Sequence, residues 1–343
     1  MRYLKTYILL AAIALFTACN KNDDTGSSTV DKPANIAVTP TVSNDNSGNV
    51  TFVVTADNAV SYEFDFGNGF FQTSTTGNVT YQYPVAGTYT VKVTAKSQTG
   101  KTAVTTIQVS VSAIETLVWA DEFNVAGAPD PSKWGFETGN NNGWGNNELE
   151  YYTTRSDNAA VSNGTLKINL KKENYMGFGW TSARMLSKGK FTFKYGRFEA
   201  RAKLPAGGGT WPAIWAMGSN IDTTPWPGCG EIDIMEHVGN QQNKIFSTLH
   251  YPNHFGGGGV SNSVINPTAS TEFHVYGFEW NATTLKFSVD GKVFHTFAND
   301  ASLPFNQNFF LILNLAMGGN FGGAVDPAVT GGTMEIDYIR IYK

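Results

Sequence analysis

The stretch Gly-Glu-Ile-Asp-Ile-Met-Glu-His, residues 230–237, places three acidic side chains within an otherwise apolar run. Side chains alternate between the two faces of a strand, so Glu231 and Asp233 share one face and Glu236 would point to the other. A one-residue β-bulge around Ile234–Met235 would return Glu236 to the face of the other two, and bulges are enriched beside active sites. The sequence therefore predicts a strand whose local irregularity gathers three carboxyl groups.

Three acids on one strand face have two interpretations. A solvated charged strip is the simpler one, but Ile232, Ile234 and Met235 alternate with the acids and no Lys or Arg stands nearby to pair with them. Buried like charges push pKa values apart, so that one carboxyl stays protonated near neutral pH while a neighbour stays ionised. We therefore favour a catalytic site over a solvated face.

Paired carboxyl groups together with clustered tryptophans indicate sugar chemistry. Cleavage of a glycosidic bond requires one acid that protonates the leaving oxygen and a second group that supports an oxocarbenium-like transition state. If the bulge brings Glu231 and Glu236 into one cleft, a carboxyl separation of about 5–5.5 Å predicts retention of configuration. Asp233 would then hydrogen-bond one of the two and hold its charge state. The residues alone leave open which glutamate attacks and which protonates.

Length and composition limit the fold class. The 343 residues suffice for two domains or one large all-β domain. Abundant glycine (36 residues), 13% aromatic and only 15% charged residues are typical of strands joined by many turns. The net charge of −4 argues against a nucleic-acid partner, which would require a basic face.

The N-terminus has the form of a bacterial export signal. Residues 1–18 combine early basic residues with an apolar run at 7–16, which is too short to cross a bilayer. The sequence Thr17-Ala18-Cys19 resembles the lipobox of bacterial lipoproteins, in which the cysteine is lipidated, and two lipid chains on Cys19 would anchor the protein stably. The polar residues 19–33 are predicted to form a flexible tether.

Residues 20–24, Asn-Lys-Asn-Asp-Asp, resemble the export tag of surface lipoproteins in some Gram-negative bacteria. We therefore predict an outer-membrane lipoprotein exposed on the cell surface, which acts as a monomer beside surface glycan-binding and transport proteins. With Cys19 lipidated, Cys229 is the one remaining cysteine, and we interpret it as a small buried side chain, not a nucleophile.

A shift in composition predicts a domain boundary near residues 112–115, because every tryptophan and histidine lies after it. Short alternating runs before it predict a β-sandwich over residues 34–113. The segments 62–69 (YEFDFGNG) and 83–91 (YPVAGTYTV) resemble the immunoglobulin-like PKD module. Such modules act as spacers or sometimes bind carbohydrate. Phe70 and Phe71 could form a sugar platform, but we expect them to pack in the loop and core and favour the spacer.

Residues 114–343 read as strand after strand, with no convincing helical period. Expected strands include 165–170, 196–204, 244–249, 273–280, 285–289, 309–315 and 333–342. Asp290-Gly291 predicts a hairpin turn. About 230 residues of antiparallel strand favour a concanavalin-like jelly roll, so that the whole chain is predicted to be all-β.

This second part resembles glycoside hydrolase family 16, in particular its laminarinase and endo-1,3(4)-β-glucanase members. The resemblance implies that Glu231 is the nucleophile, Glu236 the acid/base and Asp233 an auxiliary acid. The matching segments, in the expected order, are 119–123 (WADEF), 143–153 (GWGNNELEYYT), 181–185 (TSARM), 195–201 (YGRFEAR), 209–215 (GTWPAIW), 226–227 (WP), 230–237, 248–252 (TLHYP), 314–319 (NLAMGG) and 336–338 (IDY).

The same resemblance implies a sugar-binding groove around the three acids. Indole faces stack on the apolar face of a glucose ring, which suits Trp211 and Trp215. A place in the core is a fair alternative for Trp211 and a weak one for Trp215. Arg184 and Asn146 would hydrogen-bond sugars on the non-reducing side, with a surface ion pair as the alternative for Arg184. The remaining candidates are Trp144 and Trp226 at the rim and His250 on the leaving-group side.

No cofactor is expected for catalysis, and no Cys/His spacing suggests zinc. Family members often hold a structural Ca²⁺ away from the catalytic cleft, and the matching positions are Glu122, Gly164 and Asp337. Oxygen donors of this kind suit Ca²⁺, but a satisfied network at a strand end explains them equally well.

The sequence thus predicts a retaining endo-β-glucanase that cuts β-1,3- or mixed β-1,3/1,4-glucan by double displacement. Two alternatives stay open. One is a family 16 hydrolase of sulfated galactans, which would call for basic groups near the cleft. The other is a surface glycan-binding protein that keeps the fold, which would be expected if one of the three acids were replaced.

Overall fold

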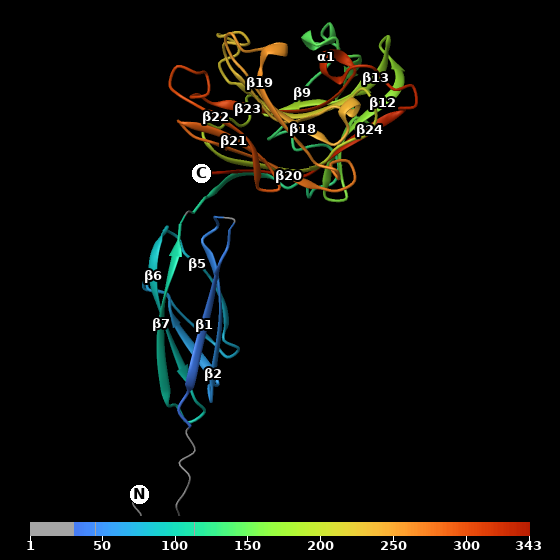
Figure 1. Ribbon diagram of the computed structural model, residues 1–343. Coiled ribbons are helices and arrows are strands. Elements are labelled where there is room, and N and C mark those ends of the chain that lie inside the picture. The colour runs from blue at the N-terminus through green and yellow to red at the C-terminus, as the bar shows by residue number, and fades with distance from the viewer. Residues whose placement is uncertain (1–30, 45, 113) are drawn as a thin grey trace, which may run out of the picture. The chain divides into compact units, whose positions relative to one another are not determined.

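The computed structural model describes residues 31–44, 46–112 and 114–343. The chain divides into two compact units, Met1–Ile114 and Glu115–Lys343 (Figure 1). The predicted signal peptide, the lipidation site Cys19 and residues 20–30 of the predicted tether lie outside the described residues. In the described ranges, no helix has the length and apolar character needed to cross a membrane.

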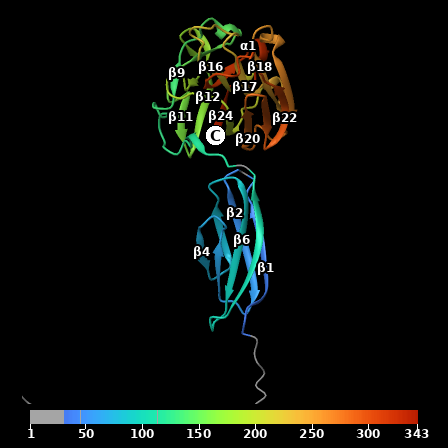
Figure 2. The same cartoon turned by 90° about the vertical axis from the view of Figure 1, so that its left-hand side faces the viewer.

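The N-terminal unit is a sandwich of two antiparallel sheets, in the orders β1-β2-β5 and β4-β3-β6-β7 (Figure 2). Strand β2 shows why the sheets face each other, because Val50, Phe52 and Val54 are buried in the core between them while the intervening residues are exposed. The strands are β1 (Ala34–Val42), β2 (Asn49–Asp57), β3 (Ser61–Asp65), β4 (Phe71–Ser74), β5 (Asn78–Gln82), β6 (Gly87–Lys96) and β7 (Thr102–Val111).

Two aromatic residues of this unit differ from the prediction. Phe70 and Phe71 are 60% and 65% exposed, so the expectation that they pack in the core is wrong. The reason is their position, since Phe70 lies in the loop before β4, and β4 is the edge strand of its sheet, where Phe71 stands opposite Asp65 of β3. The core positions are instead taken by Phe64 and Phe66.

The C-terminal unit consists of two large sheets packed face to face as in a jelly roll (Figures 1 and 2). One has seven strands in the order β19-β18-β17-β16-β23-β14-β9. The other has ten, in the order β10-β13-β12-β24-β15-β20-β21-β22, with β11 beside β12 and β8 beside β24. Their strands are β8 (Leu117–Asp121), β9 (Gly135–Glu137), β10 (Glu150–Tyr152), β11 (Ala159–Ser162), β12 (Thr165–Tyr175), β13 (Phe178–Ser182), β14 (Arg184–Leu186), β15 (Gly196–Lys203), β16 (Thr210–Gly218), β17 (Glu231–His237), β18 (Lys244–His250), β19 (Val260–Ile265), β20 (His274–Trp280), β21 (Thr284–Val289), β22 (Lys292–Ala298), β23 (Phe309–Met317) and β24 (Gly331–Tyr342).

Helical structure is sparse in the described residues, where α1 (Gly319–Gly322) is the one α-helix and η1 (Gly143–Gly145), η2 (Gly239–Gln241) and η3 (Gly256–Gly258) are single 3₁₀ turns. The all-β prediction is therefore confirmed for this part of the chain. The predicted hairpin turn is also present between β21 and β22, with Asp290 and Gly291 both at positive φ (50° and 74°). Two central residues of this kind give the turn that follows the twist of paired strands.

Strand β17 carries the predicted bulge. On one side Asp233 pairs with Trp215 of β16 and Met235 with the preceding Ile214, which leaves Ile234 as the extra residue. The pairing with β18 shifts over the same interval. Ile234 and Met235 are both buried in the core, so two consecutive apolar side chains face the same way and Glu236 returns to the face of the other two acids. The irregularity inferred from the spacing of the acids is confirmed.

Candidate active site

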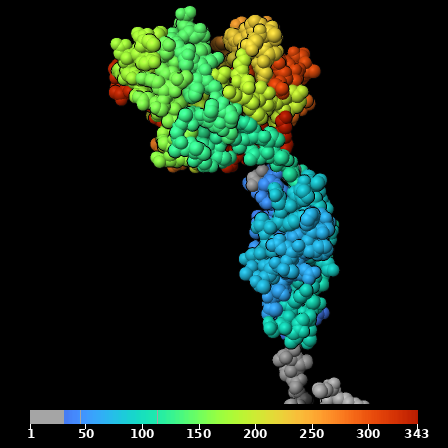
Figure 3. All heavy atoms as spheres, turned by 180° about the vertical axis from the view of Figure 1, so that it is seen from behind, coloured from blue at the N-terminus to red at the C-terminus, as the bar shows by residue number. Residues whose placement is uncertain are grey.

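A cleft of about 620 Å³ lies over the face of the seven-stranded sheet. Figure 3 shows a notch in the surface of this unit between green atoms and yellow-orange atoms. Residues from both colour ranges line the cleft, for example Trp144 and Ser261. All ten side chains that the sequence indicated for catalysis or sugar binding line it: Trp144, Asn146, Arg184, Trp211, Trp215, Trp226, Glu231, Asp233, Glu236 and His250.

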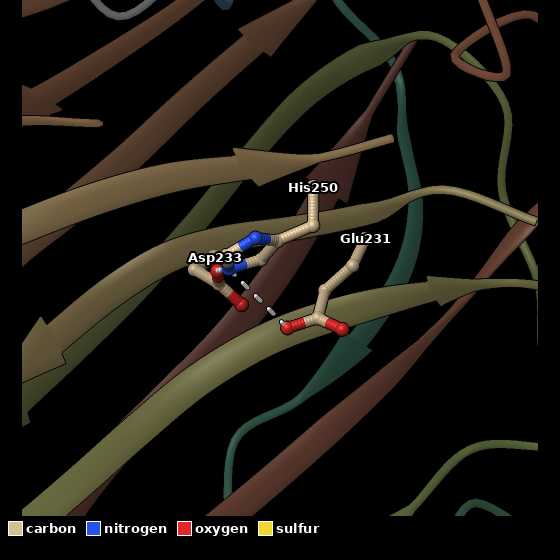
Figure 4. A group of neighbouring side chains, drawn as sticks. All are labelled: Glu231, Asp233 and His250. Carbon is tan, nitrogen blue, oxygen red and sulfur yellow. Dashed lines mark ion pairs between the residues drawn. The ribbon is translucent and has the colours of Figure 1, made fainter. Parts of the chain in front are cut away.

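The two acids before the bulge meet a histidine from the neighbouring strand (Figure 4). His250 stands opposite Glu231 in the β17–β18 register. Its Nε2 lies 3.2 Å from Asp233 Oδ2 and 3.9 Å from Glu231 Oε1. Asp233 is nearly buried, while the Glu231 side chain is 15% exposed and faces the cleft. The more accessible acid is thus the one placed to contact a bound sugar.

The third acid, Glu236, is held by two donors from different strands. The indole N–H of Trp211 on β16 donates to its Oε1 at 2.9 Å, and the hydroxyl of Thr248 on β18 lies 3.3 Å from its Oε2. Glu236 is 8% exposed. A carboxyl fixed at both oxygens is oriented before any substrate arrives, which suits a group that must transfer a proton in one direction.

Burial raises the pKa of all three acids. Burial, followed by the charge of Asp233, raises the pKa of Glu231 to about 8, against the lowering effect of His250. Burial raises the pKa of Glu236 to about 7, and the hydrogen bond from Trp211 opposes this rise. Burial, followed by the charge of Glu236, holds the pKa of Asp233 well above its ordinary value. The site therefore retains protons near neutral pH, as a general acid requires.

The three acids titrate as one group because they lie so close together. Asp233 is the most buried of them and is hydrogen-bonded to Glu231. Protonation of Asp233 removes the charge that raises the pKa of Glu231, so the proton shared by this pair can leave Glu231 as the carboxylate. The form with Glu231 ionised and Glu236 protonated is the combination that a nucleophile and an acid need.

A chain of hydrogen bonds fixes the tryptophan at the centre of the cleft. The Trp215 indole N–H donates to Asn314 Oδ1 at 2.8 Å, and Asn314 Nδ2 donates to the Tyr152 hydroxyl at 3.0 Å. Tyr152 in turn donates to Glu148 Oε2 at 3.0 Å, and Asn146 Nδ2 donates to Glu148 Oε1 at 3.1 Å. Two predicted sugar-binding residues are therefore oriented by one buried acid that the sequence did not single out.

Arg184 forms an ion pair and lines the cleft, and its contact with sugar stays a prediction. Its Nε donates to Glu137 at 2.7 Å, and its guanidinium lies 4.6 Å and 4.8 Å from the ring centres of Trp144 and Trp215. The side chain is thus held between two indoles and an acid, where a guanidinium contributes both charge and stacking.

The other tryptophans differ in exposure. Trp211 is half-buried, with its N–H bound to Glu236 and its ring edge-on to Phe321 at 5.6 Å, so it is neither a core residue nor a free platform. Trp226 is 40% exposed at the rim and contacts Phe255 edge-on at 5.4 Å.

Several cleft residues gave no signal in the sequence. They are ordinary strand or loop residues whose role depends on which neighbour the sheet supplies: Glu148, Phe246, Thr248, Ser261, Asn314 and Phe321. Glu148, Thr248 and Asn314 fall inside segments that resemble the family, and that position was the one clue to them. Cys229 is buried, as predicted, and burial raises its thiol pKa to about 11, which disfavours the thiolate that a nucleophile needs.

The three predicted calcium positions lie on or beside neighbouring strands, but their acidic side chains are paired with arginines. Glu122 follows β8 and Gly164 precedes β12, and both strands pair with β24, which carries Asp337. Both oxygens of Glu122 accept hydrogen bonds from Arg340 at 2.8 Å, and Asp337 Oδ2 accepts one from Arg201 at 2.6 Å. Glu122 thus fits an ion-pair network better than a calcium ligand, and calcium binding here stays a prediction.

One group in the described residues has the composition of a metal site, namely Glu231, Asp233 and His250, whose ligand atoms all lie within 4.8 Å of one another. The same three side chains are accounted for as a hydrogen-bonded group that holds the charge state of a nucleophile. Glycoside hydrolysis by paired carboxyl groups requires no metal, so we assign them to that chemistry.

A jelly-roll sheet with paired buried carboxyl groups in a tryptophan-lined cleft defines a glycoside hydrolase. A model of the glycosyl hydrolases family 16 matches residues 146–340. Another, of β-glucan synthesis-associated proteins, matches residues 50–225 and ends before the acidic strand. The chain belongs to glycoside hydrolase family 16.

Similar proteins include glucanases of known name. The chain is 44% identical over 243 residues to a β-glucanase from Rhodothermus marinus, which covers 66% of this chain and 85% of that protein. It is 39% identical over 250 residues to a glucan endo-1,3-β-glucosidase from Cryptopygus antarcticus, covering 65% and 90%. The X-ray structure of the laminarinase from Rhodothermus marinus matches with a TM-score of 0.64 at 41% identity, covering 67% of this chain and 97% of that one.

Proposed function

We propose that the protein is a retaining endo-β-glucanase that hydrolyses internal bonds of β-1,3-glucans, and of mixed β-1,3/1,4-glucans as a second substrate. The observation that carries the proposal is the bulge in β17, which turns Glu231, Asp233 and Glu236 toward one cleft. The names of the similar proteins, a β-glucanase, an endo-1,3-β-glucosidase and a laminarinase, support the substrate class.

In the first step of the proposed mechanism, the Glu231 carboxylate attacks the anomeric carbon and the glycosidic C–O bond breaks. Glu236 gives its proton to the leaving oxygen, so that the reducing-side saccharide departs as an alcohol and a covalent glycosyl-enzyme remains. Asp233 and His250 surround the nucleophile and adjust its charge during this step.

In the second step, the ionised Glu236 takes a proton from water, whose oxygen attacks the anomeric carbon and releases Glu231. Two inversions give the β-configuration of the starting bond. The cycle ends with Glu231 ionised and Glu236 protonated, as it began, so no co-reactant other than water is consumed.

The two alternative functions fit the cleft less well. Sulfated galactans call for basic groups, and Arg184 is the one Lys or Arg among the described residues that line the cleft. It is already paired with Glu137. A purely glycan-binding role would leave the buried acids without a purpose, although burying them costs stability.

We further propose that the enzyme is a lipoprotein anchored through Cys19, with the N-terminal sandwich as a spacer. The sequence of residues 1–24 supports this location. Metabolic labelling with a fatty-acid analogue tests it: wild type should incorporate the label, Cys19→Ala should not, and label in both would contradict lipidation at this residue.

The substrate proposal is tested by chromatography of products from laminarin, barley β-glucan and agarose incubated in parallel. We expect mixed oligosaccharides from laminarin, fewer from barley β-glucan and none from agarose. Glu231→Gln should abolish turnover while polysaccharide binding is largely kept. Release from agarose alone, or near-normal turnover by Glu231→Gln, would overturn the assignment.

A further inference from the structure

The surroundings of Glu236 include a hydroxyl that has two possible acceptors. The Thr248 Oγ1 lies 3.3 Å from Glu236 Oε2 and 3.1 Å from the Ser261 Oγ on β19. Ser261 in turn donates to the backbone carbonyl of Ser247 at 3.1 Å. A hydroxyl has one hydrogen to donate but can also accept, so Thr248 can serve only one of its two neighbours at a time.

The other contacts decide how this hydrogen is used. Because the Ser261 hydroxyl donates its hydrogen to the Ser247 carbonyl, its oxygen can accept a hydrogen bond from Thr248. Because the Trp211 indole can only donate, Glu236 Oε1 is always an acceptor and the carboxyl proton belongs on Oε2, which faces Thr248. The two protonation states of Glu236 therefore require opposite orientations of the Thr248 hydroxyl.

We propose that Thr248 is a positioning residue whose hydroxyl switches between Ser261 and Glu236 as the acid/base gains and loses its proton. This inference rests on the proposed double displacement. While Glu236 is protonated, its Oε2–H can rest on Thr248, whose hydrogen points to Ser261. Once the proton has moved to the leaving oxygen, the Thr248 hydrogen turns to Oε2 and stabilises the new charge, and the turn is reversed when water returns a proton.

No other group described around Glu236 can donate a hydrogen bond to its Oε2 in the ionised form and release it in the protonated form. The titratable ones are Glu231 and Asp233 on its own strand and His250 on β18. Strand β16 contributes the uncharged indole of Trp211, and β19 contributes only the Ser261 hydroxyl. The nearest permanent positive charge lining the described cleft is Arg184 on β14, three strands away from β17.

Thr248 itself is almost buried at 8% exposure, so water does not readily replace its hydroxyl. Ser261 lies on the edge strand β19 and is exposed. The switch is therefore anchored at its buried end, where the charge develops, and its other end can exchange with solvent. This asymmetry predicts that losing Thr248 has the larger effect.

Variants at the two hydroxyls should shift the acid/base in opposite directions. Thr248→Val removes the donor that the ionised form needs, so the basic limb of kcat/KM should move to higher pH. A well-formed hydrogen bond to a charged group is worth roughly 1–2 pKa units, and at 3.3 Å we expect about 0.5–1 pH unit. Ser261→Ala removes the competing acceptor, which leaves the Thr248 hydrogen on Glu236 and moves the limb to lower pH.

The experiment compares wild type, Thr248→Val, Thr248→Ser and Ser261→Ala by the pH profile of kcat/KM on laminarin. The carboxyl of Glu236 is titrated in the same proteins by ¹³C NMR with labelled glutamate, assigned by the signal missing in Glu236→Gln. We expect the pKa of Glu236 to be highest in Thr248→Val, intermediate and equal in wild type and Thr248→Ser, and lowest in Ser261→Ala. The serine variant keeps the hydroxyl and controls for packing.

The proposal would be overturned if the pKa of Glu236 were equal in Thr248→Val and wild type, or if Thr248→Val and Ser261→Ala shifted it in the same direction. It would also be overturned if Thr248→Ser did not keep the wild-type pKa. The NMR titration needs no turnover, so it decides the matter even if laminarin is not hydrolysed. Lack of hydrolysis by wild type would instead refute the proposed function.

Discussion

Removing the charge of the proposed nucleophile Glu231 should make the enzyme inactive but more stable. Glu231→Gln keeps the shape of the side chain and removes one of three neighbouring buried acids. The ordinary pKa of a glutamate is 4.5, and burial with the charge of Asp233 raises that of Glu231 to about 8. Below pH 4.5 the group is protonated in both the folded and the unfolded chain, so it has no effect on stability there.

The cost of the native glutamate grows between these two pKa values. As the pH rises from 4.5 to about 8, the unfolded chain is ionised and the folded one still protonated, so unfolding releases a proton and becomes easier. At about 1.4 kcal/mol per pKa unit the upper limit at pH 8 is roughly 5 kcal/mol. Because Asp233 shares the proton, we expect about 2–3 kcal/mol of added stability in Glu231→Gln at pH 8.

Tryptophan fluorescence during urea unfolding measures this gain in the catalytic unit alone, because all eight tryptophans lie between Trp119 and Trp280. The free energies of unfolding of wild type and variant should coincide near pH 4.5 and separate toward pH 8. Glu272→Gln, at an exposed position, is the matched control and should change the free energy of unfolding at neither pH 4.5 nor pH 8. A variant that is no more stable than wild type at pH 8, or equally stabilised at both pH values, would refute the electrostatic reasoning.

Three further outcomes follow from the site and the domain organisation. Glu236→Ala should lose about 10²–10⁴-fold in laminarin hydrolysis yet keep activity on aryl β-glucosides with good leaving groups, which need no proton; equal losses on both would contradict its role as acid. Tyr152→Phe breaks the link between Asn314 and Glu148, so KM for laminarin should rise roughly 5–10-fold with a smaller change in kcat, and an unchanged KM would show that the link does not orient the cleft. Deleting residues 34–112 should leave kcat on soluble laminarin nearly unchanged, whereas a large loss would make the N-terminal unit part of the catalytic one.

The bulge could be predicted because the regular alternation of side chains along a strand would place Glu236 on the face opposite the other two acids. Glu236 lies an odd number of positions after Asp233, yet the two acids are useful only on one face. Ile234 and Met235 both belong in the core, so the backbone had to absorb one residue between them. The hairpin at Asp290–Gly291 was predictable for a similar reason, since few residue pairs adopt two positive φ angles.

Other parts of the site could not be predicted because they depend on which strands become neighbours. Thr248 is an ordinary strand residue until the sheet places it opposite Asp233 and within reach of Glu236. The link from Trp215 to Glu148 crosses three segments that are far apart in the sequence. Phe71 was misjudged because hydrophobicity alone does not reveal that its strand lies at the edge of a sheet.

The stereochemistry of the first product tests the account most directly. Proton NMR of laminarin during hydrolysis distinguishes the two anomers of each new reducing end before they interconvert. Attack by Glu231 followed by attack of water predicts that the β-anomer accumulates first and the α-anomer appears only later by mutarotation. Early accumulation of the α-anomer would mean a single displacement by water, and the role of the three gathered acids proposed above would be wrong.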